Sequence, residues 1–478
     1  MSSPAAFLPL LAVVAGALVV LLLEVFLRKE KKDYLGFVSL AFLAAAAALA
    51  VLSWNKGLKY FQGMLSLDNL ALCLTLFFCL AGAFVILLSL KYIRQQEANH
   101  GEIFALLLLA LSGLMIMTSS SDLLVIFLGL EVLSVSSYAL AGLRRRDGKS
   151  GEAALKYFLL GSFASAFLVL GLAFVFGASH STFLPEIIVH MRTAAAPSVM
   201  GIAGLALVLV GIAFKVAVVP FHMWTPDVYE GAPTPVTAFF SVGPKAAGFI
   251  VLLRLFLNFW GADQSGSLFF WALWTISVLT MIVGNLAALR QTNVKRILAY
   301  SSIAHAGYLL VAILARDYSS LVFYLAAYLF MNIGAFAALI GLSKTGTEYL
   351  ELDDFAGIGF RYPWIGGTMS IFLLSLAGFP PTAGFLAKFY VFSAAVRAGH
   401  ISLAVIGVLA SLVSVFYYLR VVVSMYMREP GREVDIEVDN PALFLVLFLC
   451  LFGVLQLGIF PGNILVVIRQ AISSFPVF

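Results

Sequence analysis

Charged residues are scarce in this sequence. Lys, Arg, Asp and Glu make up 11% of the 478 residues, whereas hydrophobic residues make up 62%. A soluble domain typically contains about 25% charged and about 45–50% apolar residues. The composition therefore excludes a soluble enzyme, a disordered chain and a nucleic-acid-binding protein. It indicates an all-α polytopic membrane protein with a single membrane domain over residues 1–478.

Motifs for redox and nucleotide cofactors are also missing. Cys73, Cys79 and Cys450 lie in apolar runs without CxxC spacing, so no disulfide framework, zinc site or iron–sulfur cluster is indicated. No GxGxxG stretch precedes a helix, and there is no Walker loop. We therefore expect no cofactor or metal in this chain and no nucleic acid among its partners.

Long apolar runs dominate what is present. A helix needs about 20 residues to cross about 30 Å of hydrocarbon, and the runs of this kind lie near residues 5–27, 34–54, 69–92, 103–119, 122–143, 153–176, 201–224, 235–259, 268–289, 297–315, 320–342, 364–397, 401–427 and 441–460. These predict about 14 transmembrane helices. The first run is long enough to span and has no basic segment before it, so we interpret it as a membrane helix rather than a signal peptide.

Lys and Arg are distributed unequally between the two sets of connecting loops. The loops after odd-numbered helices contain Arg28, Lys29, Lys31, Lys32, Lys91, Arg94, Arg144, Arg145, Arg146, Lys149, Arg290, Lys295, Arg296, Lys344, Arg361, Arg428 and Arg432. The loops after even-numbered helices contain only Lys56, Lys59, Arg192, Arg316 and Arg397. Because cytoplasmic loops are enriched in Lys and Arg, we expect both termini on the outer side of the membrane.

Two of the apolar runs are interrupted by proline and glycine. The seventh contains Pro220 and is followed by Pro226, Pro233 and Pro235, and the twelfth contains the stretch GFPPTAG at 378–384. Paired interruptions of this kind are the best sequence pointer to a transport site. They lie five helices apart, which predicts two five-helix repeats, helices 4–8 (103–260) and 9–13 (268–427), flanked by helices in 1–100 and 441–478. An odd repeat length inverts the second repeat relative to the first.

A few ionisable residues lie inside the predicted membrane helices or their breaks. A charge at the bilayer centre costs about 2.5–3.5 kcal/mol on insertion scales, so such residues usually face the bundle interior and act in function. We expect proton transfer by the four deepest charges and a supporting proton path through three further residues. The four are Glu131, Lys215, Lys245 and Lys388, and the three are Lys156, His222 and His305.

Ordinary structural roles remain alternatives for several of these residues. Glu131 could make a buried structural hydrogen bond, and His305 could be a satisfied core histidine. Lys156 lies four residues after Glu152, the spacing of an ordinary ion pair on a helix surface. Arg254, near the end of its run, is expected to be an interfacial anchor.

Several motifs together resemble the antiporter-like subunits of respiratory complex I. They are DLLVIFLGLE at 122–131, Lys215 with PFHMWTPD at 220–227, APTPVTA at 232–238, KRILAYSSIAH at 295–305 and GFPPTAGFLAK at 378–388. The resemblance covers roughly residues 100–430. Among these subunits the stretch at 222–235 is most similar to subunit N. Lys388 speaks against subunit M, which carries glutamate there. A long helical extension after helix 14, which is typical of subunit L, is not seen in this sequence, and this speaks against subunit L.

The resemblance implies a fourteen-helix fold with inverted repeats and proton translocation driven by NADH oxidation and quinone reduction. NADH, FMN, iron–sulfur clusters and quinone would then be bound by partner subunits, and the other membrane subunits of the complex, including neighbouring antiporter-like subunits, would be the partners within the lipid bilayer. The location implied is the bacterial cytoplasmic (inner) membrane. Glu131, Lys215 and Lys245 match key ionisable residues of the family, and Lys388 matches the one toward the outer side. Lys156, His222 and His305 match positions on its central hydrophilic axis.

Two other functions remain open at this point. A subunit of a Mrp-type multisubunit cation/proton antiporter would share the fold, and ferredoxin-type relatives of the complex share it too. A purely structural membrane scaffold would not need four charges at mid-membrane depth.

Overall fold

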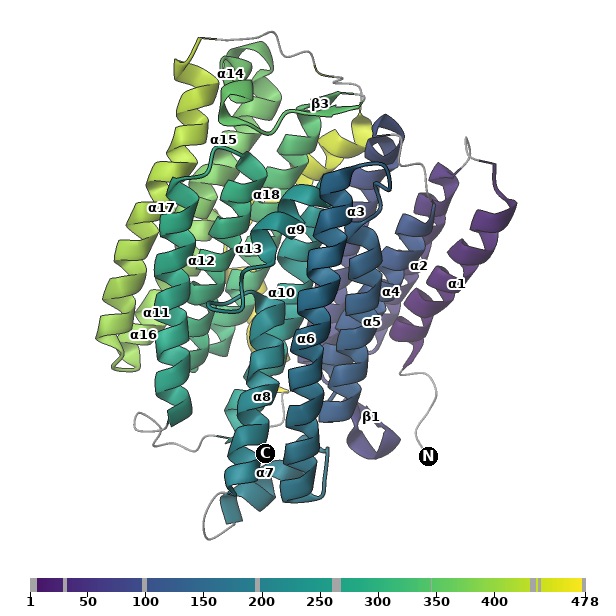
Figure 1. The fold of residues 1–478 in the computed structure, drawn as a ribbon, viewed down its shortest axis with the longest axis vertical. Coiled ribbons are helices and arrows are strands. Elements are labelled where there is room, and N and C mark those ends of the chain that lie inside the picture. Colours follow the sequence, from purple (N-terminus) through teal and green to yellow (C-terminus); the bar gives the residue numbers. More distant parts are fainter. Residues whose placement is uncertain are drawn as a thin grey trace.

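The computed structural model describes residues 7–28, 32–96, 101–193, 198–259, 268–344, 346–429, 436 and 440–474. These residues form a bundle of long helices lying side by side, with α1 and α2 on one flank and α17 on the other (Figure 1). Within the described residues, thirteen helices are long and apolar enough to cross a membrane. They are α1 (Leu8–Phe26), α2 (Asp33–Leu52), α3 (Asn69–Gln95), α4 (Glu102–Ser119), α5 (Leu123–Ala141), α6 (Gly148–Ser179), α8 (Val199–Val216), α10 (Thr234–Phe259), α11 (Leu268–Leu289), α12 (Val294–Leu314), α13 (Tyr318–Gly341), α17 (Ile401–Met427) and α18 (Pro441–Ile459). The chain is an all-α multi-pass membrane protein.

Two spans are broken, as predicted. The run at 364–397 forms two shorter helices, α15 (Pro363–Ala377) and α16 (Ala383–Arg397). Taken as one span, they bring the total within the described residues to the predicted fourteen. The seventh span ends at Val216 instead of 224, and the short helix α9 (Thr225–Gly231) follows it.

The two breaks begin with the same local structure. Ala217 follows α8 with φ 58°, and Gly378 follows α15 with φ 96°, so both residues are left-handed. The next N–H in each case bonds the carbonyl five positions back, at 3.2 Å after Ala217 and 3.0 Å after Gly378. This is the Schellman pattern of helix ends. The shared pattern agrees with a repeat that pairs helices 7 and 12, and the repeat boundaries 103–260 and 268–427 stay a prediction.

Short elements lie between the spans and after the last one. The helices are α7 (Leu184–Thr193), α14 (Ile358–Arg361) and α19 (Gly462–Ser473), with 3-10 turns η3 (Phe61–Gly63) and η4 (Leu352–Phe355). Strands β1 (Leu58–Tyr60) and β2 (Leu65–Leu67) pair antiparallel with Leu58 opposite Leu67. Strands β3 (Ser343–Lys344) and β4 (Thr347–Glu348) pair with Ser343 opposite Glu348. None of these elements is long enough to have been recognised as a span.

Aspartates fix where several spans start. The side chains of Asp68, Asp122, Asp147 and Asp317 accept hydrogen bonds from the first backbone N–H groups of α3, α5, α6 and α13. An N-cap of this kind satisfies donors that the helix itself leaves unpaired. These four aspartates therefore define helix boundaries that hydropathy alone places only approximately.

The most buried helices are α10, α12 and α13. Residues 234–255 of α10 are all buried, as is about nine-tenths of the most apolar stretch of α12 and of α13, whereas only about a third of the corresponding stretch is buried in α1, α2 and α6. The outer helices expose large apolar side chains such as Leu22, Phe163 and Leu412. Such faces suit lipid or neighbouring membrane subunits. The interior helices are thus where a charge is farthest from lipid.

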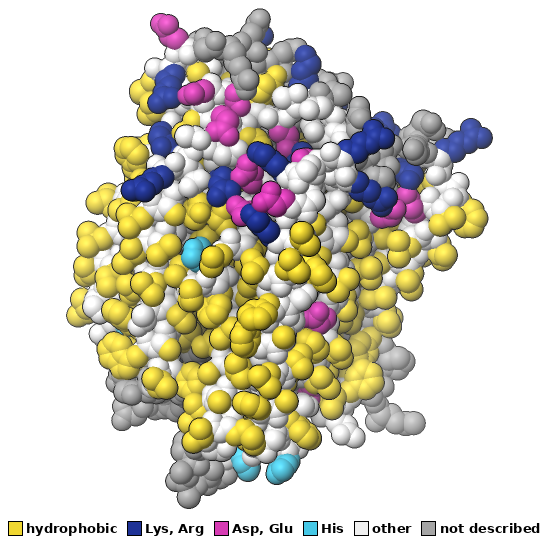
Figure 2. Space-filling model, viewed as in Figure 1, with side chains coloured by type: hydrophobic (Ala, Val, Ile, Leu, Met, Phe, Trp, Pro, Cys, Tyr) yellow, Lys and Arg dark blue, Asp and Glu magenta, His cyan; other side chains and the backbone are white. Residues whose placement is uncertain are grey.

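Charged side chains gather at one end of the bundle, above a broad hydrophobic belt (Figure 2). We call this the charged end; it carries Arg144, Glu230, Arg296, Glu348 and Asp353. The start of α3 and the end of α19 lie at the opposite end, where the Asn69 N–H donates to Ser474 Oγ at 3.0 Å. The assignment of that opposite end to the outer side of the membrane stays a prediction.

Candidate functional site

Lys215 lies at the end of α8, two residues before the first break. It is 3% exposed, and its Nζ has no hydrogen-bond partner among the described residues. The ammonium instead lies over two aromatic faces, 5.1 Å from the Tyr157 ring centre and 5.5 Å from that of Tyr138. Aromatic faces stabilise a cation more weakly than a direct ion pair does. The ammonium of the buried Lys215 is therefore stabilised only weakly by its described neighbours.

Glu131, on α5, is the acidic group that acts electrostatically on Lys215. The two do not form a direct ion pair in this conformation, because Glu131 accepts a hydrogen bond from Ser165 on α6 while Lys215 Nζ has none. The structure thus brings the predicted pair into electrostatic range and leaves them unbonded. A change in their separation would change how strongly Lys215 holds its proton.

Lys245 lies midway along α10 and is 2% exposed. Its Nζ donates to both the backbone oxygen and the hydroxyl of Ser302 on α12. Pro244, directly before it, lies inside the helix and has no N–H to give to the helix ladder. Since α8 packs against α10 and α10 against α12, Lys245 lies on the helix between those of Lys215 and Ser302.

His305 lies one turn farther along α12, inside a cluster of tyrosines. Its Nδ1 is 2.7 Å from the hydroxyl of Tyr324, and its Nε2 is 3.2 Å from the hydroxyl of Tyr418. Both Lys245 and Lys388 act electrostatically on the ring. The histidine therefore bridges the regions of the two lysines, and both of its nitrogens have partners. The alternative of a satisfied core histidine describes its hydrogen bonding correctly but does not account for its position between two buried lysines.

Lys388, on α16, folds back onto the second break. Its Nζ donates to the backbone oxygen of Ala377 at 2.9 Å and to Ser411 Oγ at 2.8 Å. The carbonyl of Ala377 is at the end of α15, where carbonyls lack helical partners and a positive charge is favoured. The side chain also borders a cavity of about 870 Å³ between α16 and α17. Lys388 thus lies at the second break, as Lys215 lies beside the first.

The predicted residues therefore fall into two sets. The first set, which we call the row, lies on α5, α8, α10, α12 and α16 and comprises Glu131, Lys215, Lys245, His305 and Lys388. Electrostatic interactions connect Glu131 with Lys215, and His305 with Lys245 and Lys388, while the helices of Lys215 and Lys245 pack against each other. No two of them share a direct hydrogen bond in the described structure. Each member except Lys215 is hydrogen-bonded to at least one serine or tyrosine hydroxyl, namely those of Ser165, Ser302, Ser411, Tyr324 and Tyr418. Hydroxyl groups both donate and accept, so they suit proton transfer between such groups.

Lys156 and His222 make up the second set, and both are partly exposed. Lys156 has a side chain 40% exposed and forms ion pairs with Glu152 at 2.7 Å and Asp227 at 2.6 Å. The ion pair predicted from helical spacing is thus present, and a second partner comes from α9. His222 lies on the turn between α8 and α9 and is partly exposed. Their expected role in the proton path stays a prediction.

Two features of the charge arrangement differ from the sequence prediction or were missed by it. Arg254 is not an interfacial anchor: it is 2% exposed and pairs with Asp68, itself 4% exposed, at 3.0 Å. Its position near a helix end suggested solvent, but α3 covers it. Glu348, at the charged end, is a buried carboxylate bonded to Arg144 at 3.1 Å. Nothing in its local sequence indicates burial.

A site for a bound metal is not evident among the residues that the structure describes. They contain no group of three or more His, Cys, Asp or Glu side chains placed to hold an ion. All three cysteines are free, and Cys79 and Cys450 are buried. The carboxylate, ammonium and imidazole side chains of the row can themselves take up and release protons.

Comparison with known proteins identifies the family. Residues 120–414 match the family described as NADH:quinone oxidoreductase/Mrp antiporter, TM. The NADH-quinone oxidoreductase subunit N of Trichlorobacter lovleyi is 46% identical over 459 residues, which cover 95% of this chain and 93% of the relative. The chain belongs to the subunit N family. A subunit N of Solibacter usitatus is 43% identical over 466 residues, covering 96% of this chain and 95% of the relative.

Solved structures share the fold of this subunit N family member. A chain of respiratory complex I from Thermus thermophilus with bound aureothin superposes with a TM-score of 0.82 at 34% identity, covering 96% of this chain and 98% of that one. A chain of an archaeal membrane-bound sulfane sulfur reductase gives 0.84 at 26% identity, covering 98% and 97%. A chain of the Mrp complex from Dietzia gives 0.84 at 20% identity, with the same coverage, and shows likeness of fold alone.

Proposed function

We propose that this chain translocates protons as a membrane-arm subunit of an NADH:quinone oxidoreductase. The observation that carries the proposal is the row from Glu131 to Lys388, in which Lys215, Lys245, His305 and Lys388 are buried and Glu131 is half-buried. Ionisable groups at this depth are costly and are usually kept for proton or ion movement. The family membership supplies the redox partner: subunit N relatives carry the name of the oxidoreductase.

The proposed assembly assigns the redox chemistry elsewhere. NADH, FMN, iron–sulfur clusters and quinone are bound by partner subunits, and this chain contributes the proton path. The exposed apolar faces of α6, α17 and α18 offer surfaces for neighbouring membrane subunits and lipid. We place the complex in the bacterial cytoplasmic membrane with both termini of the chain on the outer side, because Lys and Arg concentrate in the loops at the charged end.

The proton path proceeds through the row by changes in pairing. Separation of Glu131 from Lys215 favours release of the lysine proton, and their approach favours its uptake. Lys245 and His305 pass protons on through hydroxyl groups such as that of Ser302. Lys388, which contacts the break between α15 and α16, is the last buried lysine before the opposite end.

The test is proton pumping by the reconstituted complex carrying Lys215→Ala. The expected result is loss of pumping, while the complex still contains its flavin and iron–sulfur subunits. A Lys215→Ala complex that pumps at the wild-type rate contradicts the proposal. Gly367→Ala is a suitable control, because a Cβ there meets no atom within 4 Å.

A subunit of a Mrp-type cation/proton antiporter is the second candidate, supported by the family description and the shared fold. Purification of the native complex separates the two. Flavin and iron–sulfur centres that co-purify with this chain support the first function. Sodium export by a complex without redox centres supports the second.

A further inference from the structure

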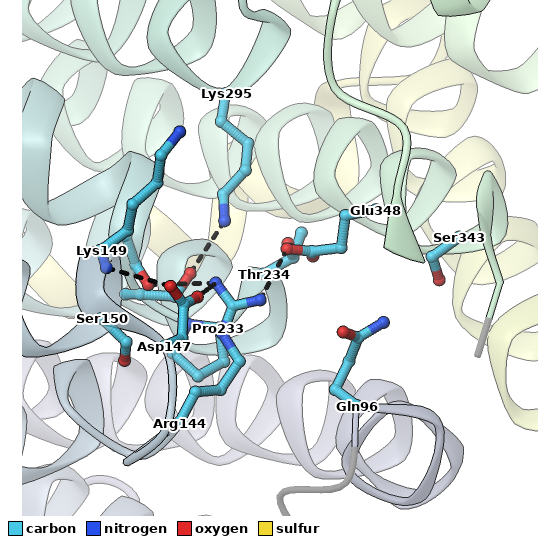
Figure 3. A network of polar contacts seen from close by, with 12 residues as sticks. Gln96, Arg144, Asp147, Lys149, Ser150, Pro233, Thr234, Lys295, Ser343 and Glu348 are labelled. Atoms are coloured by element: carbon cyan, nitrogen blue, oxygen red, sulfur yellow. Dashed lines mark hydrogen bonds and ion pairs between the residues drawn. The ribbon is translucent and has the colours of Figure 1, made fainter. Parts of the chain in front are cut away.

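Glu348 is a buried carboxylate at the meeting point of several elements. Its side chain is 8% exposed, and it accepts hydrogen bonds from the Tyr92 hydroxyl at 2.9 Å and from the Thr234 hydroxyl. Arg144 Nη1 lies 3.1 Å from its second oxygen. Figure 3 shows Arg144, Thr234 and Lys295 converging beside Glu348. These partners come from α3, the start of α10, the α5–α6 connection and α12.

The charge state of Glu348 suits a fixed anchor. Burial disfavours the ionised form of Glu348 and by itself would raise its pKa. The positive charges of Lys295 and Arg144, with the two hydroxyl donors, outweigh this effect and hold the pKa of Glu348 below its usual value. The carboxylate therefore stays ionised near neutral pH and does not exchange protons there. Its negative charge in turn stabilises the two cations beside it.

Those two cations hold the end of α9. Arg144 Nη2 donates to the backbone oxygen of Gly231 at 3.2 Å, and Lys295 Nζ donates to that of Ala232 at 2.8 Å. Carbonyls at a helix end lack helical partners, so cations there are stabilising. Lys295 lies on α12, in the second predicted repeat, whereas α9 belongs to the first. Glu348 thus connects the two halves through the groups that cap α9.

The other end of α9 contacts residues that surround Lys215. Trp224, directly before α9, stacks on Tyr157 with ring centres 4.5 Å apart and donates from Nε1 to the backbone oxygen of Phe214 at 3.0 Å. Tyr157 is one of the two rings that face Lys215 Nζ. A displacement of α9 therefore moves the wall of the space that holds the lysine.

We propose that Glu348 is a positioning residue for proton translocation. It keeps α9 in place as a barrier between Lys215 and the water at the charged end. The inference rests on the proposed function, since it assigns the row as the proton path. Glu348 holds Arg144 and Lys295, these hold the end of α9, and α9 holds Trp224 against Tyr157. Loss of the carboxylate charge releases this chain of contacts.

Passive proton entry into vesicles that contain the complete, resting complex tests this inference. Glu348→Gln keeps the size of the side chain and removes its charge. We expect it to raise the passive proton leak at least about tenfold. Loss of one hydrogen bond to a charged group destabilises the arrangement with α9 in place, and the fraction of molecules with α9 displaced rises by about that factor. Asp353→Asn is the matched control, because Asp353 lies in the same connection with a side chain 92% exposed; its leak should equal that of the wild type.

Two further variants keep the test decisive. Tyr92→Phe removes one hydrogen bond to Glu348 and leaves every charge in place, so it should assemble and give a leak between those of the wild type and Glu348→Gln. Glu348→Asp should recover part of the barrier, which a general packing defect would not allow. A wild-type leak in assembled Glu348→Gln, or in Tyr92→Phe should Glu348→Gln fail to assemble, overturns the inference.

The Lys215→Ala complex separates this inference from the proposed function. If Lys215→Ala pumps normally, the proposed function fails. If Lys215→Ala does not pump while Glu348→Gln leaks no more than the wild type, the proposed function stands and the role of Glu348 is wrong.

Discussion

The buried ion pair between Arg254 and Asp68 gives the sharpest stability prediction. Arg254 Nη2 lies 3.0 Å from Asp68 Oδ2, and the two residues are 2% and 4% exposed. Replacing Arg254 with Met leaves the Asp68 carboxylate buried without this cation. Removal of one partner from a buried pair typically costs about 3–5 kcal/mol, and we expect a loss of stability in that range.

A second ion pair in the same chain provides a matched control. Arg397 Nη2 also lies 3.0 Å from Asp317 Oδ2, but the side chains are 66% and 26% exposed. Each aspartate also caps its helix through the other oxygen, with Asp68 accepting from Ala71 and Asp317 from Ser320. Exposed pairs contribute about 0–1 kcal/mol, so Arg397→Met should change stability little. Arg254 Nη2 also donates to the backbone oxygen of Thr118 at 2.7 Å, so the two pairs differ in burial and in this further bond.

Unfolding of the purified chain in mixed detergent micelles measures both variants. The double variant Arg254→Met with Asp68→Asn removes the buried negative charge, while the asparagine side-chain oxygen can still accept the hydrogen bond that caps α3. It should therefore recover at least half of the stability lost in Arg254→Met. Equal destabilisation by Arg254→Met and Arg397→Met would refute the reasoning, since burial would then make no difference. So would a double variant no more stable than Arg254→Met alone.

Three other predictions concern the charged end and the second break. Because the pKa of Glu348 is lowered in the folded chain, its contribution to stability is present above the unfolded value near 4.5 and is lost as pH falls through the folded pKa. Unfolding curves of wild type and Glu348→Gln should therefore differ at neutral pH and converge in acid. Gly384→Ala places a Cβ 1.8 Å from the Ser375 carbonyl, so it should cost about 1–3 kcal/mol in the same unfolding assay, whereas Gly367→Ala should be neutral. Lys156→Gln should lower proton pumping in vesicles less than Lys215→Ala does, because the Lys156 side chain is 40% exposed and paired at the charged end and has only a supporting role in the path; loss of pumping as complete as in Lys215→Ala would contradict this.

The spans and breaks were predictable because their causes are local in sequence. About 20 apolar residues make a span wherever they occur. Proline lacks the N–H that a helix needs, so Pro220 and the pair Pro380–Pro381 mark interruptions without any knowledge of the fold. The buried lysines were predictable for a similar reason, since a lone charge such as Lys245 inside an apolar run has no local neighbour to pair with.

The partners of these charges were not predictable from spacing. Arg144 and Glu348 lie 204 positions apart, and Arg254 and Asp68 lie 186 apart. Only the fold determines which distant groups meet. The Glu152–Lys156 pair, four residues apart on one helix, is the kind that spacing does reveal. Its second partner, Asp227, was missed because α9 returns to α6 only after the break.

Helix α3 lies outside both predicted repeats, yet it is bonded to α10 at two places. Near the opposite end Asp68 binds Arg254, and at the charged end the Tyr92 hydroxyl accepts from the Thr234 N–H at 3.2 Å. Thr234 and Arg254 are separated by about 30 Å of helix at 1.5 Å per residue, close to the thickness of the hydrocarbon core. α3 therefore stabilises the helix that carries Lys245 at both of its ends. A chain trimmed to its two repeats would lose this support together with the flanking helices.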